Sequence, residues 1–511
     1  MVNRDLIYLV NAGNDPVQSA VSNDGSFPAS GVLALGTWLQ HRLPDGLEVI
    51  CRDGQIYGMD RIARDMASYR PGLVGISTLC TSYQNALKIA EMAKSYGAKV
   101  VFGNDQASQN SIPVLQNQRN VDFVIGAEYG ELPLELLLRH VRGEDIPLDK
   151  IPSLTYRDAS GNVVGFDWQR DKGKLSIVSP FSGYLQALHE AGIDPKKNGA
   201  LDLFPILNRN LFPQEHWQTY LANYSERFAR LHKEPVTGVA TMNRARGCSR
   251  KGDLVCKHCD IGGVLTGEVA LSSPEMFWEE IRAAHNQVRA NSIYEACDSF
   301  SSFPGLIKGI AEAKPADLGF NPQLFVYAQA RDLANHPERV QMLKDIGVFR
   351  ANVGLESMSD STLRHMKGEK DSVEQNERAL HLLKDAGIHT YGSFVLGSEK
   401  ETPTTLRETT DRVKSLIENG LLSDAEAQPV LPLAGNYQGR ILMANGLWKV
   451  DKEHPDWPVN VDELSRTYIH NFSGVSHDDC VVAANEIRAA ARKKGINFGS
   501  GASRRENYDK K

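Results

Sequence analysis

The segment GLVGISTLCTSYQNALKIAEMAKSYGAKVVFGN, residues 72–104, contains one complete strand–helix–strand pattern. Its two ends, residues 72–78 and 99–104, are short apolar and β-branched runs, as expected of buried strands. Between them, residues 82–97 repeat apolar side chains at helical spacing and end in a glycine. Two strands joined through a helix usually pair in parallel, so this segment predicts a parallel sheet covered by helices.

The same alternation continues on both sides of this segment. Further apolar runs and helical patterns alternate at residues 6–12, 30–43, 47–53, 59–70, 111–119, 122–127 and 132–143. Five strands, each followed by a helix, predict an α/β domain over residues 1–145 with a doubly wound, flavodoxin-like parallel sheet. Ligands bind such sheets at the carboxyl ends of the strands, where this chain has the glycine-containing loops 103–105 and 126–131.

The next segment, residues 146–235, is less regular. A β-hairpin is predicted across residues 160–162, Ser-Gly-Asn, and an aromatic-rich stretch follows at residues 211–231. We interpret this segment as a connector between two domains. Its aromatic side chains are expected to lie mostly in the core and the interface.

From residue 236 the strand–helix alternation resumes. Six candidate strands lie at residues 237–242, 292–297, 323–328, 349–354, 390–397 and 426–432. Helical patterns separate them, and several of these patterns begin with a capping residue followed by proline. Residues 236–445 are therefore predicted to form a partial (β/α)6 TIM-type barrel, with its chemistry at the carboxyl ends of the strands. Residues 446–511 are predicted to be a helical extension with a flexible polar tail.

Composition limits the class of protein. A chain of 511 residues with 41% hydrophobic residues is long enough for two or three hydrophobic cores. Its net charge of −6 does not favour a nucleic-acid partner, which usually requires a basic surface. The first apolar run is too short for a signal peptide or a membrane span, and seven cysteines make a disulfide framework improbable. The expected location is the cytoplasm, without a membrane partner.

Three of the cysteines fall in RGCSRKGDLVCKHCDIGG, residues 246–263, directly after the first barrel strand. Cys248, Cys256 and Cys259 have the spacing Cys-x7-Cys-x2-Cys. Thiolates are soft metal ligands, and three of them suit an iron–sulfur cluster that leaves one iron open. Two alternatives remain: a structural zinc site with His258 as fourth ligand, and three unligated thiols. The other cysteines lie in or near predicted elements and are expected to be packing residues: Cys51, Cys80, Cys297 and Cys480.

The cysteine segment resembles the cluster motif of the radical S-adenosylmethionine (SAM) superfamily. The commonest form of that motif is Cys-x3-Cys-x2-Cys, with an aromatic residue before the last cysteine. Here His258 holds that place, and the first interval is four residues longer. Three further motifs follow in the expected order: ACDSF at 296–300, VGLES at 353–357 and GSFVLG at 392–397. In the superfamily these motifs contact the methionine amino group, the ribose or amino group, and the adenine of SAM.

The resemblance implies that the three cysteines bind a 4Fe–4S cluster and that SAM is cleaved there reductively to a 5′-deoxyadenosyl radical. It implies SAM contacts by His258, Asp298, Ser299, Glu356, Ser357 and Gly397. An electron donor such as flavodoxin or ferredoxin is the expected partner. Taken singly, Glu356 also fits a surface carboxylate, and Asp298 fits the N-cap of a helix that begins near residue 304.

Three residues after the third barrel strand are candidate contacts for a small-molecule substrate: Tyr327, Gln329 and Arg331. Their position after a strand places them on the working edge of the predicted barrel. The guanidinium of Arg331 is suited to a carboxylate or phosphate, and a structural ion pair is the alternative.

The N-terminal half resembles the cobalamin-binding domain that precedes the barrel in one branch of the superfamily. The resemblance rests on residues 27–40, 72–104 and 121–132, and it implies cobalamin contacts by Ser77, Thr78, Gly103, Asn104, Gly126 and Glu128. The expected function is a cobalamin-dependent transferase that acts on a small biosynthetic metabolite by methyl transfer or another radical C–C bond formation or rearrangement. Two alternatives stay open: a radical SAM enzyme that no longer binds cobalamin, and a non-catalytic, zinc-stabilised binding protein.

Overall fold

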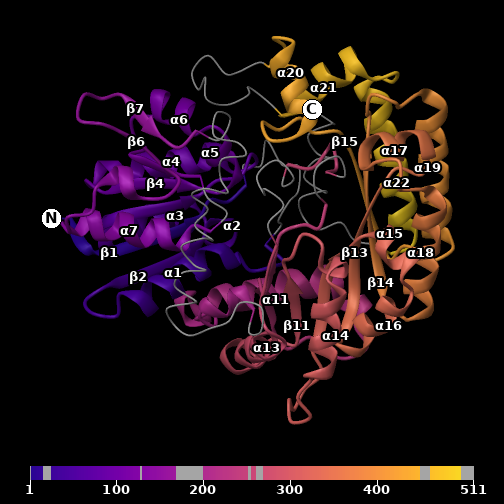
Figure 1. Ribbon diagram of the computed structural model, residues 1–511, viewed down its shortest axis with the longest axis horizontal. Coiled ribbons are helices and arrows are strands. Elements are labelled where there is room, and N and C mark those ends of the chain that lie inside the picture. Colours follow the sequence, from indigo (N-terminus) through magenta and orange to yellow (C-terminus); the bar gives the residue numbers. More distant parts are fainter. Residues whose placement is uncertain are drawn as a thin grey trace.

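The structure is a computed structural model that describes residues 2–14, 25–126, 129–167, 199–250, 255–260, 269–448 and 461–495. Two α/β bodies lie side by side, the N-terminal sheet on the left of Figure 1 and the barrel on the right. In the described parts of the chain, no helix has the length and apolar character needed to cross a membrane.

The N-terminal sheet has seven strands in the order β2-β1-β3-β4-β5-β6-β7. Its first five strands are parallel, as predicted: β1 (Asn3–Asn11), β2 (Glu48–Asp53), β3 (Pro71–Ser77), β4 (Lys99–Gly103) and β5 (Phe123–Ile125). The predicted hairpin is formed by β6 (Leu154–Arg157) and β7 (Val163–Gly165), which are antiparallel. Because β6 pairs with β5, this hairpin extends the sheet instead of belonging to a separate connector.

Helices cover both faces of this sheet because its strands are apolar on both sides. Leu6, Tyr8 and Val10 of β1 pack on one side, while Ile7 and Leu9 pack on the other. The first side is covered by α3 (Met59–Tyr69), α4 (Tyr83–Ser95) and α6 (Ser111–Asn117), and the second by α1 (Ser30–Arg42) and α7 (Glu131–Arg142). Two short helices, α2 (Gly54–Tyr57) and α5 (Asp105–Gln109), begin directly after strands β2 and β4.

An aromatic helix, α11 (Gln214–Phe228), joins the two halves. Its Tyr220 is buried in the core of the N-terminal sheet, whereas Tyr224 and Phe228 pack against Val239 of the first barrel strand. Phe27 of the N-terminal half reaches the same cluster, with its ring 5.5 Å from that of Tyr224. The described aromatic residues of the predicted connector therefore contribute to core and interface, as expected.

The second sheet has six parallel strands in the order β15-β14-β13-β12-β11-β8. These strands are β8 (Val239–Met242), β11 (Ser292–Glu295), β12 (Gln323–Ala328), β13 (Val348–Glu356), β14 (His389–Leu396) and β15 (Asp424–Pro429). The connecting helices are α13 (Pro274–Val288), α14 (Pro304–Glu312), α15 (Ala330–Asn335), α16 (Glu338–Asp345), α17 (Asp360–Lys367), α18 (Val373–Asp385) and α19 (Pro403–Glu418). The predicted partial barrel is confirmed.

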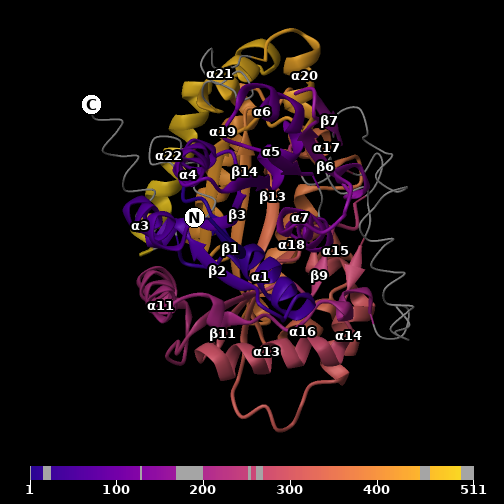
Figure 2. The ribbon, with the colours of Figure 1, turned by 90° about the vertical axis from the view of Figure 1, so that its left-hand side faces the viewer.

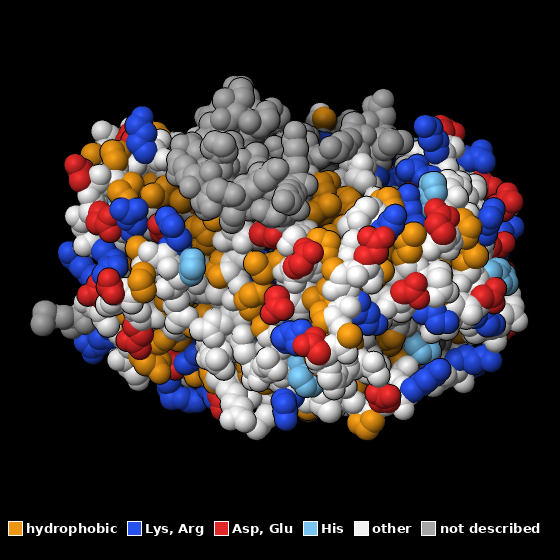
Figure 3. Space-filling model, turned by 60° about the horizontal axis from the view of Figure 1, so that its bottom comes forward, with side chains coloured by type: hydrophobic (Ala, Val, Ile, Leu, Met, Phe, Trp, Pro, Cys, Tyr) orange, Lys and Arg blue, Asp and Glu red, His pale blue; other side chains and the backbone are white. Residues whose placement is uncertain are grey.

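Local sequence signals account for several helix starts. Ser273 accepts a hydrogen bond from the backbone N–H of Met276 and is followed by Pro274 at the first position of α13. Thr402 and Thr405 form a reciprocal capping pair at the start of α19. Beyond the sheet lie α20 (Tyr437–Ala444), α21 (Val461–Phe472) and α22 (His477–Lys493), shown in yellow tones in Figure 2. Helices α21 and α22 lie within the predicted extension, while the tail beyond residue 495 lies outside the described residues. On the face of the molecule drawn in Figure 3, acidic and basic side chains are interspersed.

Candidate active site between the two sheets

The cysteine loop lies at the carboxyl end of the barrel. It leaves β9 (Ala245–Arg246), which pairs with β10 (Ala270–Leu271). The backbone N–H of Cys259 donates to the carbonyl of Cys256 at 3.1 Å, which closes the turn of the Cys-x2-Cys pair. Lys257 holds this turn on both sides: its N–H donates to Met366 at 2.9 Å, and its carbonyl accepts from Tyr437 at 3.1 Å. The two cysteines are therefore fixed between the end of α17 and the start of α20.

Gln329 connects this loop to the third barrel strand. Its Oε1 accepts from Arg250 Nε at 3.0 Å, and its Nε2 donates to Ser299 Oγ at 2.6 Å. The same Nε2 lies 3.9 Å from the sulfur of Cys248. We expected Gln329 to contact substrate, but its amide is engaged by the cysteine loop because the loop crosses the end of β12. No feature of the sequence around residue 329 indicated this role.

Buried cations surround the thiols. Burial raises the pKa of the Cys248 and Cys256 thiols, while the charges of Lys367 and Arg250 oppose this at Cys256. The guanidinium of Arg250 is itself held by Asp371 at 2.6 Å and by the carbonyl of Lys367 at 2.7 Å. A thiolate in such a place needs further positive charge, which a metal cluster supplies. The donor set therefore fits an iron–sulfur cluster.

His258 and Glu356 meet across the site, although they are about one hundred residues apart in the chain. His258 Nε2 lies 3.4 Å from Glu356 Oε1, and His258 Nδ1 is buried without a hydrogen-bond partner. Glu356 has a left-handed backbone, with φ of 61°, and only 6% of its surface is exposed. It is therefore not a surface carboxylate, and the strained conformation turns its side chain towards the cysteine loop.

Glu356 is stabilised as an anion. Burial alone would raise its pKa, but the neighbouring His258, Lys367 and Arg250 together hold the pKa of this carboxyl below its usual range. The contact with Glu356 also removes His258 Nε2 as a zinc ligand. Across the ranges that the structure describes, no three His, Cys, Asp or Glu side chains are arranged as ligands of one metal ion. A structural zinc site needs four ligands around one ion, whereas a cubane takes one thiolate on each of three irons.

Asp298 follows the second barrel strand and faces the N-terminal half. Burial, with a further contribution from the negative charge of Asp105, raises the pKa of Asp298 to about 6. Asp105 belongs to α5, so this pair of carboxylates spans the two halves of the protein. The alternative role of Asp298 as the N-cap of this helix is wrong, because Phe303 occupies the N-cap position of α14.

For three other predicted SAM contacts, interactions within the protein explain the residue type. Ser299 Oγ is hydrogen-bonded to Ser302 and Gln329. Ser357 Oγ is fully buried and lies 3.0 Å from Thr409 Oγ1 in α19, on the helical side of the sheet. A side chain at Gly397 would come within 2.6 Å of Ile469 in α21. Hydrogen bonds within the protein account for the two serines, and close packing accounts for the glycine.

The remaining substrate candidates behave differently from one another. Tyr327 is half-buried and packs edge-on against Tyr294, with the ring centroids 5.8 Å apart. Arg331 forms an ion pair with Asp371 at 3.4 Å, so the structural alternative holds for this residue.

Cys51, Cys297 and Cys480 are buried as predicted, whereas Cys80 is only half-buried and lies near the charges of Asp260 and Asp105.

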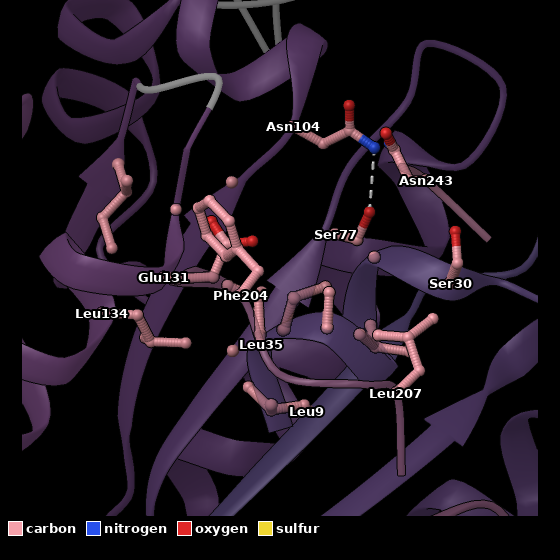
Figure 4. A pocket seen from close by; sticks show the side chains of 18 of the residues that line it. Leu9, Ser30, Leu35, Ser77, Asn104, Glu131, Leu134, Phe204, Leu207 and Asn243 are labelled. Atoms are coloured by element: carbon pink, nitrogen blue, oxygen red, sulfur yellow. Dashed lines mark hydrogen bonds between the residues drawn. The ribbon is translucent and has the colours of Figure 1, made fainter. Parts of the chain in front are cut away.

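A cavity of about 330 Å³ opens at the carboxyl edge of the N-terminal sheet (Figure 4). Three of the residues predicted to bind cobalamin line it: Ser77, Gly103 and Asn104. Asn104 Nδ2 donates to Ser77 Oγ at 3.0 Å, so the two polar groups lie together at one side of the cavity. Thr78 is not part of the lining. Its hydroxyl donates to the carbonyl of Gly103 and accepts from Ala107 N, which fixes the loop after β4.

Gly126, another predicted cobalamin contact, is not part of this lining. A side chain at Gly126 would come within 2.6 Å of Phe166, so close packing requires glycine there. Glu128 lies outside the described residues.

The lining of the cavity has an apolar part and a charged part, in which Arg246 pairs with Glu131 and Arg244 pairs with Glu280. Its apolar lining includes Leu9, Leu35, Val101, Ile125 and Leu134. Asn243, from the loop after the first barrel strand, also lines it, and its Oδ1 is buried without a partner. Such a cavity fits a flat apolar group attached to a polar one, as in the nucleotide tail of cobalamin. The residues present therefore fit this cofactor.

Direct contacts bring the two ligand edges together. Gln109 Nε2, in α5, donates to Asp260 Oδ2 at 2.6 Å, and Asp260 is the residue after the cysteine Cys259. Arg246, just before the cysteine loop, forms an ion pair with Glu131 of α7 at 2.9 Å. The N-terminal sheet therefore directs its carboxyl edge at the barrel mouth.

Comparisons with known proteins agree with this arrangement. Residues 242–413 match the Radical SAM superfamily. The anaerobic magnesium-protoporphyrin IX monomethyl ester cyclase of Rubrivivax gelatinosus is 32% identical over 354 residues, which are 68% of this chain. The chain spans about half the length of that relative, 55%.

Two solved structures share the fold of most of the chain. The radical SAM methyltransferase TsrM from Kitasatospora setae, solved with cobalamin and a 4Fe–4S cluster, has a TM-score of 0.62 at 17% identity and covers 87% of this chain and 78% of its own. The cobalamin-dependent SAM radical enzyme OxsB has a TM-score of 0.59 at 17% identity and covers 96% and 62%. Through residues 242–413 the chain belongs to the radical SAM superfamily, and its N-terminal half shares the fold of these two cobalamin-containing structures.

Proposed function

We propose that this protein is a cobalamin-dependent radical SAM enzyme in which Cys248, Cys256 and Cys259 hold a 4Fe–4S cluster. The contact between His258 and Glu356 carries this proposal, because it joins the cysteine loop to the strand end expected to bind SAM. When bound and reduced, the cluster supplies the electron that cleaves a C–S bond of SAM, which generates the 5′-deoxyadenosyl radical that abstracts a substrate hydrogen. The proposed domains are residues 1–145, to whose sheet the hairpin of β6 and β7 is added, and residues 236–445; the rest of 146–235 is the proposed connector and 446–511 the proposed extension.

The chain's own residues bind and orient SAM. Glu356 stays ionised at neutral pH and is placed to accept hydrogen bonds from the ribose or amino group of SAM. Asp298 is an anion above a pH of about 6 and offers a second acceptor for the amino group. His258 orients Glu356, while Ser299, Ser357 and Gly397 support the strand ends around the ligand.

Cobalamin is proposed to bind at the facing edge of the N-terminal sheet. The cavity bordered by Ser77, Gly103 and Asn104 supports this location, as do the cobalamin-bound structures of TsrM and OxsB. A cofactor there lies opposite the cysteine loop, to which α5 is attached through Gln109. Closing the barrel with a second domain also excludes water from a radical reaction.

The proposed reaction is methyl transfer, or another radical C–C bond formation or rearrangement, on a small biosynthetic metabolite. The electron donor is proposed to be a flavodoxin or ferredoxin. Neither a nucleic acid nor a membrane is proposed as a partner, in keeping with a net charge of −6.

Anaerobic reconstitution tests the proposal. The chain is produced with hydroxocobalamin, reconstituted with iron and sulfide, and incubated with SAM and dithionite. We expect about four irons and about one cobalt per chain, brown colour with broad absorbance near about 400 nm, and release of 5′-deoxyadenosine. Iron without cobalt would leave a radical SAM enzyme that lacks cobalamin, while a colourless protein with stoichiometric zinc would refute the proposal.

A further inference from the structure

The barrel sheet has one apolar face and one polar face. Along β13, Ala351, Val353 and Leu355 are buried in the hydrophobic core beneath the helices, while Arg350 and Asn352 point to the other face. The same alternation occurs in the next two strands. On the polar face lie Tyr391 and Ser393 of β14 and Asp424, Glu426 and Gln428 of β15. Several of these polar side chains are half-buried, so the inner face of the barrel is not packed like a core.

This polar face is closed at the end that holds the amino termini of the strands, which is called its lower end below. The guanidinium of Arg350 lies over the rings of Phe228 and Phe325, at 4.3 and 4.6 Å from their centroids. It also forms an ion pair with Asp424 at 3.1 Å. Phe27 from the N-terminal half stacks on Phe325 at 5.5 Å. These aromatic rings form a floor in which the charge of Arg350 is balanced by Asp424.

The next layer of side chains, towards the carboxyl ends of the strands, combines two tyrosines with hydrogen-bond acceptors. Tyr327, Asn352 and Tyr391 are neighbours in the register of β12, β13 and β14, so their side chains share this face. Asn352 is 5% exposed, and its Oδ1 is buried without a hydrogen-bond partner. Tyr391 donates its hydroxyl to Glu426 Oε2 at 2.8 Å. A buried amide oxygen without a partner is unusual in a folded protein, and a bound ligand is one way to satisfy it.

This acceptor layer lies below the proposed SAM site. Asn352 is four residues before Glu356 on the same strand, and Tyr327 is two residues before Gln329, which contacts the cysteine loop. A molecule held in the layer would therefore lie beside the strand ends that are proposed to bind SAM.

We propose that this layer, defined as Tyr327, Asn352, Tyr391 and Glu426, is the substrate-recognition site. It selects a small ring compound that carries N–H or O–H donors, neutral or cationic, over one that carries a carboxylate. The inference rests on the proposed function, since it assumes that the reaction occurs at the barrel mouth. Tyrosine faces pack on a flat ring and attract a cation. Asn352 Oδ1 and the carboxylate of Glu426 accept from its donors, whereas an anionic group would face Glu426 while Arg350 is already paired with Asp424.

A matched pair of probes tests this selectivity. Tyramine and 4-hydroxyphenylpropionate share a phenol ring but carry an ammonium or a carboxylate. Their dissociation constants are measured by calorimetry on the reconstituted full chain with SAM and without reductant. We expect tyramine to bind at least about tenfold more tightly, since charge-assisted hydrogen bonds are the strong ones. Glu426→Gln should remove this preference, and Asn352→Leu should weaken tyramine about threefold or more.

Glu408→Gln is the matched control, since it removes a carboxylate from the exposed side of α19 on the outside of the same barrel. It should leave both dissociation constants unchanged. Equal binding of the two probes, binding of neither, or a preference that survives Glu426→Gln would overturn the inference. Iron content and 5′-deoxyadenosine release are measured on the same samples. A full cluster with no probe preference rejects this inference alone, whereas a missing cluster rejects the proposed function.

Discussion

The two sheets direct their carboxyl edges at one another, but the edges are built from different groups. The barrel edge is organised by charge: Arg250 is paired with Asp371 at 2.6 Å, and His258 lies 3.4 Å from Glu356. The N-terminal edge offers a cavity of about 330 Å³ with the neutral pair Ser77 and Asn104 in its lining, and the charges of Arg244 and Arg246 in that lining are balanced by Glu280 and Glu131. A charged ligand needs opposite charges at fixed places, whereas a large neutral ligand needs volume and a few hydrogen bonds.

Because of this difference, the two sites are not equally easy to recognise from a sequence. At the barrel edge, the chemistry requires particular side chains, so a change of residue type destroys the site. At the N-terminal edge, much of the lining is apolar or backbone, and many residue types provide the same shape. Substitutions at one edge, followed by measurement of iron, cobalt or SAM binding, test this contrast.

The largest effect is expected from removing a proposed cluster ligand. Cys256→Ala should abolish cluster assembly and SAM cleavage, because a cubane bound by two thiolates is not retained. Iron content and the absorbance near about 400 nm measure the loss. Cys51→Ser is the matched control, since that thiol donates to the carbonyl of Val32 at 3.3 Å inside the N-terminal core. A Cys256→Ala protein that keeps a full cluster would show that the ligand assignment is wrong.

A smaller effect is expected from filling the N-terminal cavity. Leu35→Trp places an indole in the proposed cobalamin site, and a steric cost of roughly 2–3 kcal/mol would weaken cobalamin binding by ~30- to 140-fold. Cobalt content after gel filtration measures binding, and iron content should not change. Val482→Trp, on a side chain that is 56% exposed in α22, serves as control. Unchanged cobalt in the Leu35→Trp protein would place cobalamin elsewhere.

The smallest effect is a pH dependence that links the two edges. Because the pKa of Asp298 is raised to about 6, the carboxylate that accepts from SAM is lost as the pH falls through 6. At pH 5.5 about one quarter of Asp298 is ionised, so SAM should bind about fourfold more weakly than at pH 8. Calorimetry of SAM binding to the reconstituted protein gives this profile.

Two variants separate Asp298 from other titrating groups. Asp298→Asn should flatten the profile. Asp105→Asn removes the neighbouring negative charge and should move the midpoint to lower pH. Asp317→Asn, at an aspartate whose side chain is 81% exposed and pairs with Arg282, is the control. A midpoint that does not move in Asp105→Asn would show that the N-terminal half does not act on Asp298.

Much of the fold could be predicted because it depends on local periodicity. The apolar runs at residues 72–78 and 99–104 became β3 and β4, and the six runs after residue 236 became the six barrel strands. The capping residues Ser273 and Thr402 start helices as expected. The hairpin was also predicted from its turn, but its pairing with β5 was not, because pairing depends on a partner thirty residues away.

The candidate site was predictable only in part. Short motifs pointed to the three cysteines, Glu356 and Asp298, and the structure brings Glu356 into contact with the cysteine loop through His258. They also named Ser357 and Gly397, whose residue types are explained by contacts with Thr409 and Ile469. Gln329 was assigned to substrate, yet its amide holds the cysteine loop.

The sequence by itself determined the order of strands and helices, because that order follows from neighbouring residues. It also determined the residue types of the proposed metal ligands for the same reason. Folding in three dimensions was needed to bring Asp105 to Asp298, Gln109 to Asp260, and Asn352 beside Tyr327 and Tyr391. These pairs are separated by 25 to about 190 residues, so their contact depends on strand register and on how the two halves pack. Their charges and unsatisfied hydrogen bonds arise only once burial has removed water from both partners.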